Sequence, residues 1–291
     1  MSVPKDVGAT SLIVAYARAQ ETRRPDAIFL DRWAEVAVRA ATAQPEGPLP
    51  RMGFAREDDP SPFWRDFTTY LAMRTVFYDE HILKAYADGV RQVVLLAAGL
   101  DARACRLGLP PDTTVFEVDH ADVLAFKEQI LATVGEPTTC PRVVVAADLR
   151  EDWLAKLTDA GFRPGLPAVF VAEGLLMYFT PEQSDDLLRE ITAASAPGSR
   201  FLSEYPARQP TEDFLLSRCA DDIDRAAAAG LSALLKSGPA VEPSGWLTGY
   251  GWKPEVTDVA SLVAELGRPV PAMVGDAPDA ITVWLLAGSR G

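Results

Sequence analysis

The sequence predicts an α/β protein built on a doubly wound, mostly parallel sheet, and three observations lead to that fold class. The chain has 291 residues and is 48% hydrophobic and 24% charged, which is enough material for one large buried core. Short apolar runs recur through its middle. They alternate with segments of helical periodicity, and such alternation is typical of parallel sheets.

The expected strands are short runs bounded by turn residues. They cover residues 91–98, 113–118, 141–147, 167–172, 199–204 and 280–287. The first four are rich in Val and Phe and apolar almost throughout, which is typical of strands buried on both faces. We therefore expect helices on both sides of the sheet.

Helical signals follow several of these runs. Residues 121–134 and 256–266 carry apolar side chains at helical spacing. Thr180, Pro181 and Gln183 match an N-cap, a first-turn proline and a capping-box partner. Each of these segments is therefore expected to contain a helix.

The flanking regions do not alternate in this way. Residues 1–88 read as helices with a proline-rich loop at 44–53, and residues 207–250 read as helices followed by a Gly/Pro-rich stretch. We interpret 1–88 as an N-terminal helical cap and 207–250 as a cap insertion. Both surround a single domain whose α/β core is formed by 89–206 and 251–291.

Composition excludes several classes of partner. The 41 Asp and Glu outnumber the 28 Lys and Arg, giving a formal net charge of −13, whereas nucleic acids and anionic membranes attract basic faces. No segment approaches ~20 uninterrupted apolar residues, and the N-terminus lacks a signal-peptide pattern. The three cysteines and two histidines match no metal-ligand spacing. We expect a cytoplasmic protein with a small-molecule partner and no metal.

Acidic residues follow four consecutive expected strands. They are Asp101, Asp119, Asp148 and Glu173. Because ligands of open parallel sheets bind beyond the carboxyl ends of the strands, these acids are expected along one rim of a binding site.

The loop after the first strand indicates which cofactor suits this rim. Asp119 lies twenty residues after Gly99, the spacing at which a carboxylate binds a ribose diol. A dinucleotide site requires three glycines, but residues 97–102 contain only Gly99, and Asp101 would repel a pyrophosphate. A cofactor with an amino group and a sulfonium suits acidic loops better, which favours S-adenosylmethionine.

Five segments resemble the leucine carboxyl methyltransferase superfamily, and most closely its bacterial branch of tetracenomycin carboxyl O-methyltransferase-like proteins. They are LLAAGLDARACRL (95–107), VFEVDHADVLAFK (115–127), VAADLREDW (145–153), FVAEGLLMYFTPEQ (170–183) and ARAQETRRPDAIFLDRWA (17–34). The expected sheet is then the seven-stranded, Rossmann-like methyltransferase sheet, mostly parallel with an antiparallel C-terminal strand. Ala97 departs from the resemblance, since the family often has glycine there.

The resemblance also implies roles for individual residues. Gly99 and its neighbours approach the methionine moiety, Asp119 binds the ribose, Asp148 and Leu149 meet the adenine, and Glu173 lines the cleft. Arg74 resembles the arginine that holds the cofactor carboxylate. The candidate cofactor-binding residues are Arg74, Ala98, Gly99, Asp101, Asp119, His120, Asp148, Leu149 and Glu173.

Some of these residues also have structural interpretations. Arg74 shares a helical face with Phe67, Leu71 and Tyr78, and an unpaired buried charge is costly. Its partner is either a carboxylate ligand or one of the rim acids. Asp101 and Asp148 match helix N-caps as well.

The expected reaction is O-methylation. Methyl transfer from a sulfonium is an in-line displacement, and an ionised carboxylate acceptor needs no general base. No His/Asp pair in the sequence indicates such a base, which favours a carboxylic acid over a phenol. The resemblance implies that this acid is a polyketide or another secondary metabolite. Candidate acceptor-binding residues are Tyr16, Arg18 or Arg23, Tyr178, Tyr205 and Trp246.

Two other classes of function remain open from the sequence. A nicotinamide-dependent oxidoreductase would have the same kind of sheet, but its loop after the first strand would carry three glycines instead of one. A non-catalytic cofactor-binding protein would have both the same sheet and the same loop.

Overall fold

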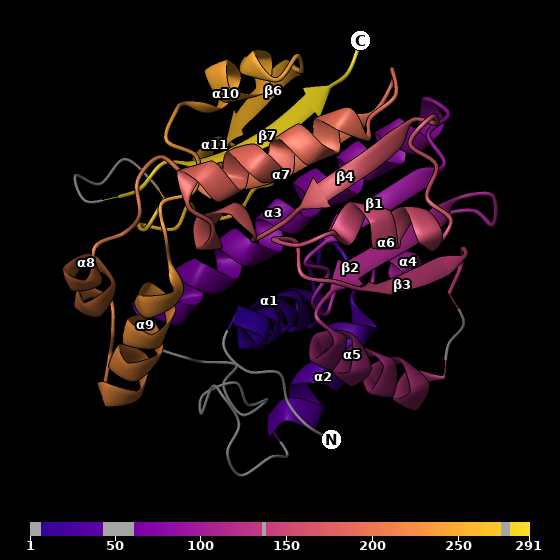
Figure 1. The fold of residues 1–291 in the computed structure, drawn as a ribbon. Coiled ribbons are helices and arrows are strands. Elements are labelled where there is room, and N and C mark those ends of the chain that lie inside the picture. The colour runs from indigo at the N-terminus through magenta and orange to yellow at the C-terminus, as the bar shows by residue number, and fades with distance from the viewer. Residues whose placement is uncertain (1–6, 43–60, 136–137, 275–279) are drawn as a thin grey trace.

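The computed structural model describes residues 7–42, 61–135, 138–274 and 280–291, and it is organised around one seven-stranded sheet (Figure 1). The strands are β1 Gln92–Leu96, β2 Thr114–Asp119, β3 Arg142–Ala146, β4 Ala168–Ala172, β5 Arg200–Pro206, β6 Lys253–Asp258 and β7 Val283–Ser289. They lie in the order β3-β2-β1-β4-β5-β7-β6. Strands β1 to β5 pair in parallel, and β7 runs antiparallel to both β5 and β6.

This topology confirms the predicted fold class, including the antiparallel C-terminal strand. All six expected strands are present with small shifts of their ends. The seventh strand, β6, was not among the runs chosen from the sequence. The prediction of a helix over 256–266 was wrong at its start, because residues 256–258 belong to β6 and helix α11 begins at Val259.

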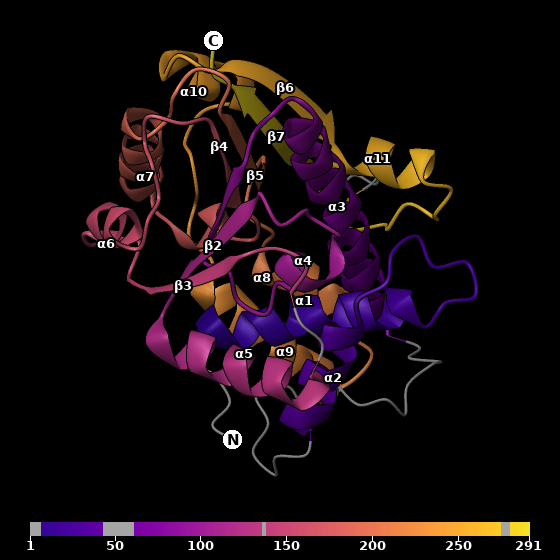
Figure 2. The ribbon, with the colours of Figure 1, turned by 90° about the vertical axis from the view of Figure 1, so that its right-hand side faces the viewer.

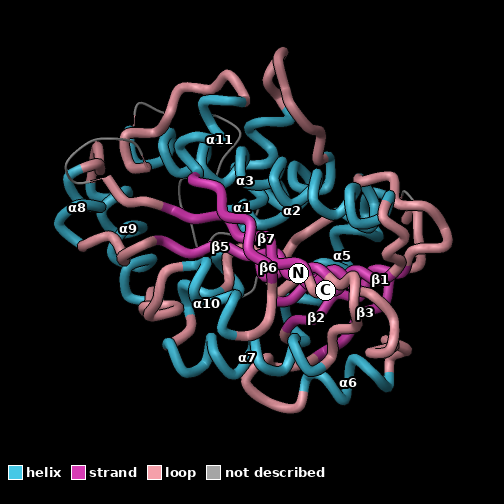
Figure 3. Tube along the Cα trace, turned by 90° about the horizontal axis from the view of Figure 1, so that it is seen from above, coloured by secondary structure: helices cyan, strands magenta, loops and turns pink. Residues whose placement is uncertain are grey.

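Helices cover both faces of the sheet. The helices are α1 Val7–Thr22, α2 Arg32–Thr42, α3 Pro62–Ala87, α4 Arg103–Arg106, α5 Ala121–Val134, α6 Trp153–Asp159, the 3-10 turn η1 Leu176–Tyr178, α7 Pro181–Ala193, α8 Glu212–Ser217, α9 Asp222–Leu234, α10 Pro243–Gly249 and α11 Val259–Glu265. Figure 2 shows α6, α7 and α10 on one face and α3 and α11 on the other. Figure 3, seen from above, shows the same two layers with α5 on the side of α3.

The two layers exist because successive strand residues point to opposite faces. In β1, Val93 and Leu95 join the core beneath α3, whereas Val94 and Leu96 join the core beneath α6 and α7. Apart from its first residue, Gln92, the strand is therefore apolar throughout, as the sequence predicted for strands covered on both sides.

Strand β3 does not follow that prediction. It lies at one edge of the sheet, and of its five residues only Val145 is buried, while Val144 is 39% exposed. The run is apolar like its neighbours, but an edge position leaves part of each face uncovered.

The capping signals at the start of α7 are confirmed. The Thr180 hydroxyl accepts a hydrogen bond from the Gln183 amide, and the Gln183 side chain accepts one from the Thr180 amide, 3.0 Å away. Pro181 occupies the first turn, where its missing N–H removes no helical hydrogen bond.

Two groups of helices lie at one end of the sheet. Helices α1, α2, α8 and α9 gather there in Figure 1, from the ranges assigned to the cap and to the cap insertion. Helix α10, from the second of these ranges, packs instead against β6 and β7. The proline-rich segment 44–53 lies outside the described residues. None of the described helices is both long and apolar enough to cross a membrane.

Candidate functional site

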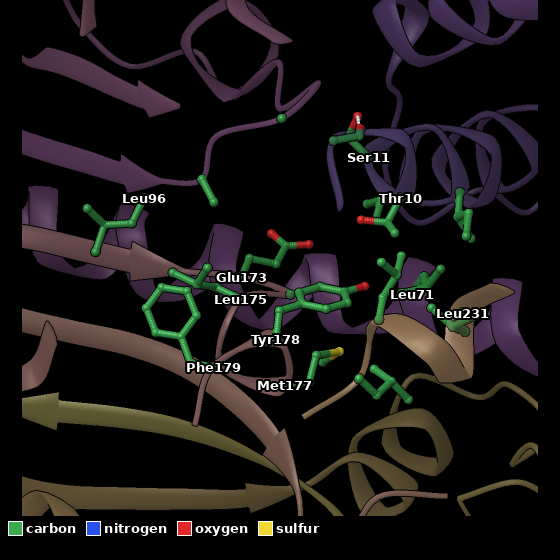
Figure 4. A pocket seen from close by; sticks show the side chains of 18 of the residues that line it. Thr10, Ser11, Leu71, Leu96, Glu173, Leu175, Met177, Tyr178, Phe179 and Leu231 are labelled. Carbon is green, nitrogen blue, oxygen red and sulfur yellow. Dashed lines mark hydrogen bonds between the residues drawn. The ribbon is translucent and has the colours of Figure 1, made fainter. Parts of the chain in front are cut away.

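A cavity of about 440 Å³ lies at the carboxyl edge of the parallel strands. The ends of β1, β2, β3 and β4 contribute its walls on one side, and α1, α3, η1 and α9 contribute others (Figure 4). All nine residues predicted to bind a cofactor line it: Arg74, Ala98, Gly99, Asp101, Asp119, His120, Asp148, Leu149 and Glu173. They come from segments up to 99 residues apart, which only the fold brings together.

The loop after β1 turns sharply at the cavity wall. Gly99 has φ +48°, and Ala97 has φ +51° although it carries a Cβ. A Cβ at Gly99 would lie 2.9 Å from Cβ of Ser11 on α1. Glycine is therefore required at 99 both for backbone conformation and for the close approach of α1.

Asp119 ends β2 and fixes this loop. One carboxylate oxygen accepts from the Gly99 amide at 2.7 Å, and the other accepts from the His120 amide at 2.7 Å. Burial raises the pKa of Asp119, and the two backbone N–H groups partly oppose that shift. Each oxygen retains acceptor capacity for a further donor.

Asp148 follows β3 and is held by Arg150. One oxygen accepts from the Arg150 amide at 2.9 Å, and the other lies 2.5 Å from Nη2 of Arg150. These hydrogen bonds lower the pKa of Asp148 to about 2. Arg150 was not predicted as a site residue, although it directly follows the Asp-Leu pair that was.

Glu173 follows β4 and lies among three arginines. Its Oε1 is 2.9 Å from Nη2 of Arg18 and 3.3 Å from Nε of Arg74, and its Oε2 is 2.7 Å from Nη1 of Arg103. Burial alone would raise the pKa of Glu173, but Arg18, Arg103 and Arg74 outweigh it and hold the pKa well below its ordinary value. The carboxylate is thus charged and, as Figure 4 shows, turned into the cavity.

Asp101 belongs to the same ionic cluster. It pairs with the Arg103 guanidinium and accepts from the Arg103 amide at 2.8 Å. The sequence also allowed Asp101 as a helix N-cap, but the N-cap of α4 is Ala102, so that interpretation was wrong. Burial opposes ionisation of Asp101, but Arg103 and Arg18 lower its pKa overall.

Glu204 was missed by the sequence prediction. It is fully buried in β5, pairs with Arg74, and accepts hydrogen bonds from the Gly174 amide at 3.0 Å and from the Tyr78 hydroxyl. Burial raises its pKa, and Arg74 opposes the shift. The available signal was an acid at the end of the fifth apolar run, like those after the first four.

Arg74 therefore has the structural partners that the sequence considered as one alternative. It is 2% exposed, bonded to Glu204 and Glu173, and still lines the cavity. The ion pairs satisfy its charge within the protein and fix the direction of its guanidinium.

The residues predicted to bind the acceptor divide into two groups. Arg18 and Tyr178 line the cavity. Tyr178 points toward Thr10 on α1 in Figure 4, and burial raises its pKa against a hydrogen bond with Thr10. These two residues are placed where an acceptor could meet them.

Three other predicted acceptor residues lie away from the cavity wall. Tyr16 packs edge-on against Trp64. The Tyr205 hydroxyl donates to the Val241 carbonyl at 2.9 Å, and Trp246 Nε1 donates to Asp185 at 2.8 Å. The polar atoms of Tyr205 and Trp246 are thus satisfied inside the protein.

Two of the predicted acceptor residues lie off the cavity wall for simple reasons. Tyr205 lies on the other face of its strand, and Arg23 is held in an ion pair. Glu204 pairs with Arg74 and Tyr78 of α3 behind the cavity wall, so its neighbour Tyr205 must face the opposite core. Arg23, the alternative to Arg18, pairs with Glu35 at 2.9 Å and does not line the cavity.

The sheet order, the reversed seventh strand and the cavity beyond β1 to β4 define a protein of the methyltransferase fold. Over 95% of the chain, the structure is similar to 94% of the crystal structure of a "putative methyltransferase" from Thermobifida fusca YX, with a TM-score of 0.52 and 16% identity. It is also similar to a DUF574 family protein from Streptomyces avermitilis MA-4680, with a TM-score of 0.57, 13% identity and 97% of each chain covered.

Sequence comparison gives the family. The leucine carboxyl methyltransferase family model matches residues 11–192. A Parafrankia sp. (strain EAN1pec) protein named "Putative S-adenosyl-L-methionine-dependent methyltransferase" is 41% identical over 271 residues, covering 91% of this chain and 83% of that relative. The chain therefore belongs to the leucine carboxyl methyltransferase family.

Proposed function

We propose that this protein is an S-adenosylmethionine-dependent O-methyltransferase that esterifies the carboxylate of a small molecule, such as a polyketide or another secondary metabolite. One observation carries the proposal: the four acids after β1 to β4 line a single cavity together with Gly99 and Arg74. Family membership and the names of the relatives support the cofactor.

The chemistry of the cavity wall fits this cofactor. Asp119 keeps acceptor capacity for ribose hydroxyls, and Glu173 offers a charged carboxylate to an ammonium group. Arg74 offers a guanidinium to a carboxylate, and Leu149 offers an apolar surface to adenine. Asp148 is ionised and can accept from an exocyclic amine in addition to Arg150.

The protein's part in the reaction is to bind and orient. The cofactor supplies a methyl group on a sulfonium, which is already electrophilic. The cavity wall holds the acceptor oxygen in line and excludes water, which is catalysis by proximity. Among the described residues of the wall, His120 is the only imidazole. It lies beside Asp119 at the proposed ribose site, so a carboxylate acceptor, which needs no base, suits the site best.

Cofactor binding by Asp119→Asn tests the first part of the proposal. The change removes the charge and one strong acceptor, so the Kd for S-adenosylmethionine should rise about 10- to 100-fold, since a hydrogen bond to a charged group contributes about 1.5–3 kcal/mol. Isothermal calorimetry measures this. Absence of binding to the wild-type protein would refute the proposed function.

The kind of product tests the second part. Transfer of a labelled methyl group to a panel of acids and phenols should give a product that releases methanol in mild base, as methyl esters do. A base-stable product would indicate phenol ether formation instead. Cofactor binding without transfer to any member would favour a non-catalytic binding protein.

A further inference from the structure

The part of the cavity beyond Glu173 is almost entirely apolar. It is walled by η1, by the segment after β5, by α8 and α9, and by residues before and within β7. Its wall includes Met177, Phe179, Leu215, Leu231, Met273 and Ile281. In Figure 4, Tyr178 is drawn between Glu173 and Leu231, and we call the part of the cavity on the Leu231 side the apolar chamber.

Gln209 lies in the wall of this chamber with an unsatisfied side chain. Both polar atoms of its amide are buried, and neither has a hydrogen-bond partner among the described residues. An amide left without partners away from water costs about 1–3 kcal/mol. A group in this position is expected to have a partner when the cavity is filled.

The segment around Gln209 is anchored at fixed points. The Ala207 amide donates to the Thr282 carbonyl at 2.7 Å, and Nη2 of Arg208 lies 3.3 Å from the Ala280 carbonyl. The next residue, Pro210, also lines the cavity and has no N–H to offer. The amide of Gln209 is therefore the hydrogen-bonding group that this segment presents at a fixed place.

The charges of the wall show which ligand group is suited to this amide. Arg18 and Arg74 are engaged by Glu173 and Glu204. Lys236 is exposed, and its Nζ lies 3.4 Å from the Gln183 side chain. A second charge on the acceptor, placed beside the uncharged Gln209 amide among apolar side chains, would be desolvated, which is costly. A neutral group carries no such penalty.

We propose that Gln209 is a specificity-determining residue of an acceptor site in this chamber. Its ligand is a mainly apolar carboxylic acid that carries, away from the methylated carboxylate, one uncharged hydroxyl or amide. The Gln209 carbonyl accepts from that group and the Gln209 amine donates to it. This inference rests on the proposed methyltransferase function and narrows its acceptor.

Ligand binding to the cofactor-loaded protein tests this without requiring turnover. The protein is saturated with S-adenosylhomocysteine, and calorimetry compares linear and aryl carboxylic acids with their hydroxylated counterparts and with dicarboxylic acids of equal length. The hydroxylated member of a pair should bind about tenfold more tightly, as expected for one hydrogen bond that satisfies a buried amide. Gln209→Met, which keeps the length of the side chain, should abolish that difference and leave binding of the plain acids within about twofold.

Matched measurements separate the possible failures. Gln129→Met makes the same change on the exposed side of α5, away from the cavity, and should leave the preference intact. Gln209→Met should keep the wild-type affinity for S-adenosylhomocysteine and should not lower the unfolding temperature. Failure of the wild-type protein to bind S-adenosylhomocysteine would refute the proposed function itself. If the wild-type protein binds S-adenosylhomocysteine normally, three results would refute the acceptor inference alone. They are that no acid binds, that dicarboxylic acids bind best, or that Gln209→Met keeps the preference.

Discussion

Glu173 and Glu204 contact the same arginine, yet their pKa values shift in opposite directions. Glu173 is surrounded by three guanidinium groups, which outweigh the effect of burial. Glu204 pairs with Arg74, Arg18 contributes less, and burial dominates. The number of cations in contact with each carboxyl therefore sets the direction in which its pKa shifts.

Glu173→Gln should destabilise the protein most at neutral pH. Removing one partner of a buried ionic cluster costs about 3–5 kcal/mol. Because the folded pKa of Glu173 lies below its ordinary value of 4.5, the stabilisation is fully present above that value and is lost as pH falls toward the folded pKa. The difference in unfolding free energy between variant and wild type should thus be large near neutrality and shrink in acid.

Urea denaturation at about pH 7 and about pH 3 measures this difference. Glu128→Gln serves as the control, because Glu128 pairs with Arg142 on the surface and is about half exposed. That change should cost less than about 1 kcal/mol at either pH. A cost for Glu173→Gln that does not depend on pH would contradict the proposed charge state.

Ala97 is the second residue whose environment has a measurable consequence. Its φ of +51° lies in the left-handed region, which costs a residue with a Cβ about 1–2 kcal/mol. Ala97→Gly should relieve that strain. Glycine also has more conformational entropy in the unfolded chain, which offsets part of the gain, so the unfolding free energy should rise by up to about 1 kcal/mol.

Chemical denaturation of Ala97→Gly and Ala98→Gly checks this. Ala98 is not among the described residues with positive φ, and it is buried. Glycine at 98 should therefore lower stability by roughly 0.5–1 kcal/mol or more. Equal losses in both variants would mean that position 97 is not strained.

At the scale of elements, the cavity depends on close contact between α1 and the loop after β1. Gly99 allows that contact, because a Cβ there would meet Ser11 at 2.9 Å. Arg18, two helical turns further along α1, pairs with Glu173. The first helix is thereby held against the ends of β1 and β4.

Gly99→Ala should push α1 away from the strand ends and weaken cofactor binding by at least about tenfold, since positioning errors at a site are costly. Gly108→Ala is the matched control. Gly108 also has positive φ, +69°, but its Cβ would meet nothing within 4 Å. Both variants should lose about 1–2 kcal/mol of stability from backbone strain, and only Gly99→Ala should lose affinity in calorimetry. Equal affinities would contradict the role of the α1 contact.

The elements also show where prediction from the sequence stops. Valine-rich β1 and the capping box of α7 could be predicted, because both signals are local. Strand β6 could not, since Lys253, Glu255 and Asp258 interrupt its apolar pattern and its pairing with β7 is long-range. Tyr205 was chosen and Glu204 missed because the sequence alone does not tell which alternate residues of a strand face α3 and its Arg74.

At the scale of the whole molecule, the cavity exists only in the folded chain. Its wall combines residues from α1, α3, four strand ends, α9 and β7. A ligand in this cavity therefore binds the folded state in preference to the unfolded state and shifts the unfolding equilibrium.

S-adenosylhomocysteine at about 100 times its Kd should stabilise the fold by about 2.7 kcal/mol and raise the unfolding temperature by roughly 5 °C. Differential scanning calorimetry measures the shift. NADH at the same concentration is the control and should have no effect, because the loop after β1 lacks the three glycines of a dinucleotide site. A shift with NADH alone would favour the oxidoreductase alternative.

The sequence by itself determined the fold class, six of the seven strands of the sheet, and the acids that follow four of them. These depend on local periodicity and on the rule that parallel strands end at one edge. The tertiary structure alone decided that Arg150 lines the cavity, that Glu204 holds Arg74 behind the cavity wall, and that Tyr16, Tyr205 and Trp246 pack elsewhere. It also decided that Gln209 lies in the wall of the apolar chamber, with no hydrogen-bond partner for its amide among the described residues. The physical reason is that side-chain direction and burial depend on contacts between segments distant in the chain, which no local pattern encodes.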